Sequence, residues 1–114
     1  MSLSEGDLIE IDAEAAVGHE QAGRRPALVV SVNALQSALG LAIVCAVTTH
    51  GGRAERARND LEVAIPGGLP VKGVILPHQV RTIDSKARHA AKLCAVPRVT
   101  LQVTRARLKI LLGL

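Results

Sequence analysis

Residues that can move protons or hold an anion gather in three short segments of the chain. The first segment, 18–26, contains His19, Glu20 and Arg25. An imidazole exchanges protons near neutrality, and a carboxylate beside it can orient the ring or act as the base. A planar guanidinium binds two phosphate oxygens at once. The second segment is an apolar run that ends at Thr48, whose hydroxyl can donate to a phosphate. These residue types suit proton transfer at an anionic group.

The third segment runs from His78 to Arg81. A second imidazole at His78 would supply the complementary acid, because two imidazoles in opposite protonation states can share such a reaction. Gln79 and Arg81 are better suited to positioning a substrate. His50 and His89 belong to no motif, and we expect both to be solvated.

Each candidate also has a purely structural interpretation. Arg25 can be a surface arginine beside Pro26, and Thr48 can be an ordinary β-branched strand residue. Glu20 can form an ion pair with a neighbouring arginine in a loop, and His78 can be a strand residue that faces solvent. The residue types alone leave both interpretations open.

The charges are distributed unevenly along the chain. Residues 1–20 contain six acids and neither Lys nor Arg, whereas residues 81–114 contain eight bases and one acid, Asp84. This bias favours an anionic partner such as nucleic acid or an acidic protein segment, although a solvated basic surface gives the same pattern. The chain has no Phe, Trp or Tyr, so bases cannot stack on aromatic rings.

Length and composition indicate one domain, 1–114, with an aliphatic core. Hydrophobic residues make up 48% of the chain, which argues against disorder. No apolar run approaches the ~18 residues that cross a membrane. The start of the chain lacks the basic region of a signal peptide. We therefore expect a cytoplasmic protein with no membrane association.

Neither a metal ion nor a cofactor is expected. The two cysteines form no CxxC pair, and Cys45 lies within the apolar run 41–47, where it is predicted to be a small core residue. Gly51-Gly52 and Gly67-Gly68 are typical of turns, because neither belongs to a phosphate-binding fingerprint.

Short strands are predicted where apolar and β-branched residues alternate or run together. They cover residues 8–12, 27–32, 41–47, 61–65 and 73–83. The run 41–47 is apolar on both faces and is expected at the centre of the sheet. The last strand is expected to break at Pro77, which lacks a ladder donor. Residues 13–25 and 50–59 are expected to be loops.

Two helices are predicted. Asn33 is expected to cap a short turn through Ala38, and Pro97 suits the first position of a terminal helix. The apolar stripe of that terminal helix is predicted to consist of Val99, Val103, Ala106 and Ile110, widened by Leu101, Leu108, Leu111 and Leu112. Short strands followed by one long helix indicate an α+β fold, either a small twisted barrel or a sheet plus helix.

Several segments resemble the MazF/PemK/Kid family of toxins. Residues 18–26, GHEQAGRRP, match its signature G-[SH]-E-Q-x-G-x-R-P. Residues 6–9 are similar to its opening strand, 47–49 to the end of its third strand, 79–84 to its DQVRSID segment, and 101–113 to its terminal helix. The matches occur in order over nearly the whole chain.

This resemblance implies a small SH3-like β-barrel with a C-terminal helix, the MazF/CcdB-like fold. It also implies a homodimer that acts as the toxin of a type II toxin–antitoxin system, bound by a cognate antitoxin with an acidic tail. The implied activity is sequence-specific, metal-independent cleavage of single-stranded RNA to 2′,3′-cyclic phosphate and 5′-OH ends. Two alternatives share the fold: a CcdB-like inhibitor of DNA gyrase, and a non-catalytic RNA-binding module.

The resemblance also assigns residues. It implies catalytic roles for Arg25, Thr48, His19 and Glu20, and RNA contacts for Gln21, Arg24, Thr49, His78, Gln79 and Arg81. Two positions depart from the family. Glu10 stands where an aromatic residue is usual, and His78 stands where Asp is usual. The second departure leaves the role of His78 open between proton transfer and substrate contact.

Overall fold

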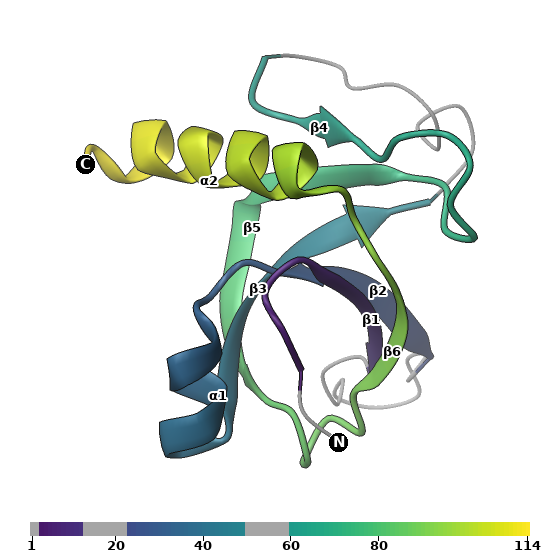
Figure 1. Cartoon of the computed structure of the whole chain (residues 1–114), viewed down its shortest axis with the longest axis vertical. Helices are drawn as coiled ribbons and strands as arrows, with labels where there is room; N and C mark the ends of the chain where they lie inside the picture. The colour runs from purple at the N-terminus through teal and green to yellow at the C-terminus, as the bar shows by residue number, and fades with distance from the viewer. Residues whose placement is uncertain (1–2, 13–22, 50–59) are drawn as a thin grey trace, which may run out of the picture.

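The computed structural model describes residues 3–12, 23–49 and 60–114. Figure 1 shows how its strands and helices are arranged. In order, these elements are β1 (Asp7–Asp12), β2 (Arg24–Val29), α1 (Asn33–Leu39), β3 (Leu41–Thr48), β4 (Val63–Ala64), β5 (Val74–Asp84), β6 (Ala91–Ala95) and α2 (Arg98–Leu112).

The strands form one sheet in the order β4-β5-β3-β2-β1-β6, and every neighbouring pair is antiparallel. The sheet curls into a half-barrel, and α2 crosses one end of it (Figure 1). The expected α+β fold is therefore confirmed. The apolar run 41–47 does lie at the centre, because β3 pairs with β2 on one side and with β5 on the other.

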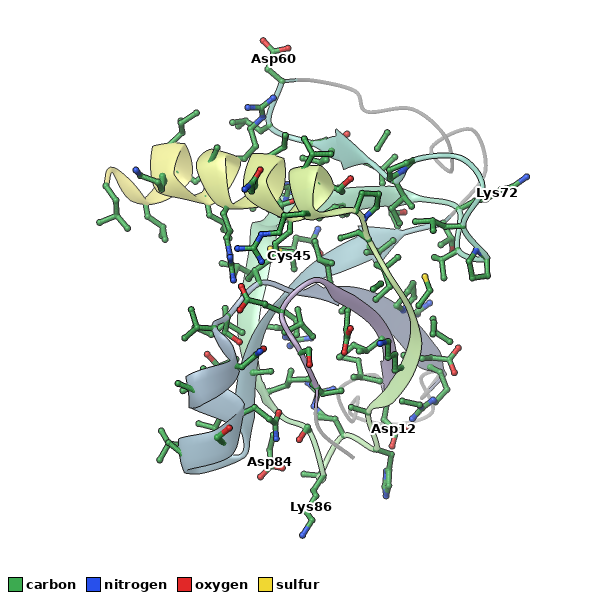
Figure 2. The ribbon with its side chains drawn as sticks, viewed as in Figure 1. Asp12, Cys45, Asp60, Lys72, Asp84 and Lys86 are labelled. Atoms are coloured by element: carbon green, nitrogen blue, oxygen red, sulfur yellow. The ribbon has the colours of Figure 1, made fainter. Side chains whose placement is uncertain are left out.

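Side chains of both sheet faces are buried. One cluster includes Leu8, Leu28, Cys45 and Ile75 and is covered by Leu101 of α2. Cys45 is fully buried and lies near α2 in Figure 2, which confirms it as a core residue. Its burial raises the pKa of the thiol to about 12. The second cluster occupies the other face. Because successive side chains of a strand point to opposite faces, β1 contributes to both.

The buried face of α2 differs from the predicted stripe. Thr100, Leu101 and Thr104 are its buried residues, whereas Val99 and Ile110 are 62% and 65% exposed. The predicted burial of Leu101 is confirmed, and Val103 and Leu108 pack against the core, whereas Val99 and Ile110 were wrongly placed in the buried stripe. Thr104 can be buried because its hydroxyl donates to the Thr100 carbonyl at 2.9 Å. The apolar end of α2 extends past the sheet (Figure 1). Within the described ranges, neither helix is long and apolar enough to cross a membrane.

Three strand predictions need correction. β2 is Arg24–Val29 instead of 27–32, and it begins within the expected loop 13–25 because Arg24 and Arg25 pair with the end of β1. β4 is limited to Val63–Ala64 instead of 61–65. β6, Ala91–Ala95, was not predicted, since its sequence AKLCA contains no β-branched residue. The short helix is confirmed as α1, and it is followed by Gly40, whose φ is 70°. The predicted cap was wrong: Val32 is the N-cap, and the Asn33 side chain accepts from the Glu5 N–H at 2.8 Å instead of capping the helix.

Candidate active site

A cavity of about 350 Å³ opens where β1 ends, β2 begins and β3 ends, with β5 beside them. Its apolar base includes Ile11, Ala27 and Val44, which belong to the second hydrophobic cluster. The polar residues that line it are Asp12, Arg25, Thr48, Gln79, Arg81 and Arg88. Four of the predicted site residues are therefore brought together: Arg25, Thr48, Gln79 and Arg81.

Strand register places Arg25 in the cavity and Arg24 outside its lining. Arg25 pairs with Ile11, and Arg24 pairs with Asp12. Adjacent residues of a strand point to opposite faces, so the two arginines separate. Arg25 is exposed at the cavity, where its guanidinium can meet an anion.

Arg24 is held by acidic partners on β1. Its Nη1 donates to Asp12 Oδ1 at 2.9 Å, its Nε lies 3.3 Å from Glu10 Oε1, and its Nη2 donates to the Glu10 carbonyl at 3.0 Å. These contacts raise the pKa of Arg24, chiefly through the hydrogen bond to Asp12. They also explain why a glutamate is accommodated at position 10. An RNA contact by Arg24 stays a prediction.

A bulge in β5 presents Gln79. Leu76 pairs with Ala46 and Val80 pairs with Cys45, which leaves residues 77–79 without a partner in β3. Pro77 has no backbone N–H to donate, so it loses no hydrogen bond where the pairing is interrupted. Its side chain is fully buried. The predicted break at Pro77 is thus an interruption of pairing within a continuous strand. Gln79 reaches the cavity lining, whereas the exposed His78 is not part of it.

Thr48 lies at the last position of β3, opposite Val74. It is half-buried and lines the cavity, as its predicted role requires, while its neighbour Thr49 is exposed outside the lining. His19, Glu20 and Gln21 lie outside the described residues, so their roles stay predictions.

Sequence reasoning missed Asp12 and Arg88 as cavity residues. Arg88 was visible only as one of the eight bases in 81–114, and Asp12 only as the end of a strand. The structure joins them: the Asp12 backbone N–H donates to the Arg88 carbonyl at 2.9 Å, and Arg88 Nη1 donates to the Asp12 carbonyl. His89 Nδ1 lies 2.6 Å from Asp12 Oδ2. That hydrogen bond, followed by the one from Arg24, lowers the pKa of Asp12.

Comparison with known proteins identifies the family. A family profile described as PemK-like, MazF-like toxin of type II toxin–antitoxin systems matches residues 4–112. The chain belongs to the MazF/PemK family of endoribonuclease toxins. The family expected from residues 18–26 is thus confirmed.

Among MazF/PemK relatives, the chain is 33% identical over 111 residues to endoribonuclease PemK of Escherichia coli, covering 96% of this chain and 82% of PemK. It is 34% identical over 108 residues to the toxin MazF of Escherichia coli K12, covering 95% and 92%.

Solved structures agree with the MazF/PemK assignment. A MazF crystal structure from Deinococcus radiodurans matches with a TM-score of 0.83 and 36% identity, covering 100% of this chain and 99% of that one. A MazE–MazF complex from the same organism matches with a TM-score of 0.88 and 35% identity, covering 100% and 98%. A mycobacterial endoribonuclease, 20% identical with a TM-score of 0.76, shares the fold.

Proposed function

We propose that this MazF/PemK toxin acts in the cytoplasm and cleaves single-stranded RNA at specific sequences without a metal ion, thereby inhibiting translation. The observation that carries the proposal is the meeting of Arg25 and Thr48 in one cavity, although they lie on different strands. Gln79, Arg81 and Arg88 line the same cavity. The cavity therefore combines donors for a phosphate with an amide that can form hydrogen bonds to a base.

The proposed reaction is an internal transfer at phosphorus. The ribose 2′-oxygen loses its proton to a base and forms a bond to the adjacent phosphorus. The bond from phosphorus to the 5′-oxygen then breaks, and an acid supplies the proton that this oxygen takes. The products are a 2′,3′-cyclic phosphate and a 5′-OH end, and neither water nor a metal enters this step.

Arg25 and Thr48 are assigned to the charge that develops on the phosphoryl oxygens. A guanidinium can donate two parallel hydrogen bonds to two of those oxygens. The Thr48 hydroxyl can add a third donor, and fixed donors of this kind lower the barrier because they need no reorganisation. Proton transfer is assigned to His19 and Glu20, which lie outside the described residues.

The proposed protein partner is a cognate antitoxin with an acidic segment that is disordered until it binds. A MazE–MazF complex among the similar structures supports this proposal, as does the basic bias of residues 81–114. The affinity should weaken as salt rises, because exposed charges are screened. An affinity that is equal in low and high salt would count against the charge argument.

We also propose that the single domain, 1–114, forms a homodimer. The end of α2 exposes Ile110, Leu111, Leu112 and Leu114, which are 65%, 39%, 61% and 82% exposed. A two-fold interface is the commonest way to cover such a surface.

The test of function is incubation of the purified protein with a long RNA in EDTA. The expected result is discrete fragments whose 5′ ends are labelled by polynucleotide kinase without prior phosphatase treatment, as 5′-OH ends are. Loss of cleavage in EDTA, with recovery on adding a divalent ion, would overturn the metal-free reaction. Inhibition of DNA gyrase without RNA cleavage would favour the CcdB-like alternative. RNA binding without fragments would indicate a non-catalytic module.

A further inference from the structure

A network of charged side chains joins three elements beside the cavity. The Asp12 carboxylate at the end of β1 binds Arg24 of β2 through Oδ1 and His89 through Oδ2, at 2.9 Å and 2.6 Å. His89 belongs to the β5–β6 connection, which runs from 85 to 90. Figure 2 shows Asp12, Asp84 and Lys86 at the end of the molecule away from α2. One carboxylate therefore ties the connection to two strands of the sheet.

His89 has an unusual backbone for this role. Its φ is 51°, and it is the one non-glycine residue with positive φ in the described ranges. That left-handed conformation is unfavourable for a residue with a Cβ atom, so it persists only where surrounding contacts hold it. The side chain is 76% exposed, and its Nδ1 contacts the Asp12 carboxylate. The backbone contributes one more bond, from the His89 N–H to the Lys86 carbonyl at 3.1 Å. The expectation that His89 is merely solvated is therefore incomplete.

The network reaches the cavity through Arg88. Its guanidinium donates to the Asp12 carbonyl, and its own carbonyl accepts from the Asp12 N–H at 2.9 Å. Both Arg88 and Asp12 line the cavity that contains Arg25 and Thr48. The placement of Arg88 thus depends on how firmly the connection is held against β1.

We propose that His89 is a positioning residue of the ribonuclease site, which through Asp12 holds Arg88 in the cavity so that its guanidinium contacts a phosphate of the RNA. This inference rests on the proposed function. Arg88 supplies a cation separate from Arg25, and it contacts a phosphate that does not react. Such a contact is equally strong in the bound substrate and in the transition state, so its loss raises KM and leaves kcat nearly unchanged.

Charged residues of β1, β2 and the β5–β6 connection belong to the network around His89. Asp12 and Glu10 come from β1, Arg24 comes from β2, and Lys86 and Arg88 are on the same connection. Asp12 is the group in contact with the ring, and a protonated imidazole binds a carboxylate more strongly than a neutral one.

The test compares the wild-type protein with His89→Ala, His89→Gln and Asp12→Asn, using steady-state cleavage of a short RNA at pH 6. His89→Ala is expected to raise KM about tenfold at pH 6 with kcat within about twofold, as loss of one charge-assisted contact predicts. His89→Gln keeps a hydrogen-bonding group at this position. It is expected to restore part of the affinity that His89→Ala loses. Asp12→Asn is expected to have the same KM phenotype.

Two controls separate the possible outcomes. Lys86→Ala removes a charge from the same connection, at a side chain directed away from the molecule (Figure 2), and is expected to leave KM within about twofold. The Arg88 Nε–H signal in a ¹⁵N spectrum reports its placement without any RNA, and it is expected to shift in His89→Ala but not in Lys86→Ala. A wild-type protein that cleaves no RNA would refute the proposed function. A wild-type protein that cleaves, with His89→Ala unchanged in KM and in the Arg88 signal, would overturn the positioning role alone.

Discussion

A Cβ atom on Gly73 would lie 2.6 Å from the backbone carbonyl oxygen of Thr48. It would also approach Val47 Cγ1 to 3.0 Å and Thr49 Cγ2 to 3.2 Å. The backbone at the end of β3 therefore packs directly against a position that only glycine can occupy. Thr48 is placed by this contact as well as by its own strand.

Gly73→Ala is expected to lower both stability and cleavage. The backbone oxygen cannot rotate away as a flexible side chain would, so either β3 or the chain at 73 must move. Overpacking of this kind costs about 1–3 kcal/mol. Thermal unfolding and kcat measure the two effects. Gly67→Ala is the matched control, since its added Cβ meets nothing within 4 Å. Equal kcat in Gly73→Ala and wild type would show that the placement of Thr48 does not limit the reaction.

Arg25→Ala is expected to reduce kcat by roughly 10²–10³, because a donor aimed at developing charge is lost. Arg25→Lys should remain poor, since an ammonium cannot make the same two-point contact. Arg98→Ala, on α2 and outside the cavity lining, removes the same charge and is expected to cleave like wild type. If Arg25→Ala and Arg98→Ala lose equal activity, net charge rather than position is responsible.

His78→Ala is expected to leave the shape of the pH–rate profile unchanged. The side chain is exposed and is not part of the cavity lining, which favours substrate contact over proton transfer. His78→Asp should then keep activity. Loss of one limb of the profile in His78→Ala, with the protein folded and still binding RNA, would establish the imidazole as an acid or base.

The free energy of unfolding is expected to fall as the pH is lowered, in part because Glu5 becomes protonated. Its hydrogen bond with Arg105 lowers its pKa, with Arg98 adding to the effect, and the Glu5–Arg105 pair measures 2.8 Å. A carboxyl with a lowered folded pKa stabilises the protein above its unfolded pKa, about 4.3, and that contribution is lost as pH falls through the folded value. Urea unfolding at pH 7 and pH 3 should show a smaller loss for Glu5→Gln than for wild type. Asp60→Asn, which removes an exposed carboxylate, is the control (Figure 2). Identical pH dependence in Glu5→Gln and wild type would contradict the assignment.

The exposed end of α2 predicts that two copies of the chain associate. Sedimentation equilibrium of wild type should give twice the chain mass of 11.9 kDa. Leu112→Asp, at a position 61% exposed, is expected to shift the mass towards one chain because a buried charge would be unpaired at the interface. Leu39→Asp, 67% exposed on α1, is the comparison. A concentration-independent monomer of the wild-type protein would refute the homodimer.

Local patterns in the sequence predicted much of what the structure contains. The run 41–47 indicated a central strand, and the structure has β3 there. Pro97 predicted the start of α2, which begins at Arg98. The signature in residues 18–26 predicted the family, which is confirmed, and it implied a catalytic role for Arg25, which stays a prediction. These features depend on residues that are close together in the sequence, so the local sequence is enough to predict them.

Only the tertiary structure decided which of the candidate residues reach the cavity. Arg24 and Arg25 are adjacent in sequence, but the β1–β2 register pairs Arg24 with the carboxylates of Glu10 and Asp12 and places Arg25 in the cavity lining. Arg88 lies 76 residues from Asp12, and only the paired ends of β1 and the β5–β6 connection bring them together. The buried face of α2 was likewise decided by the sheet beneath it, which selected Thr100 and Thr104 over Val99 and Ile110. Strand register and packing direction depend on partners that are distant in sequence, so local sequence periodicity cannot predict them.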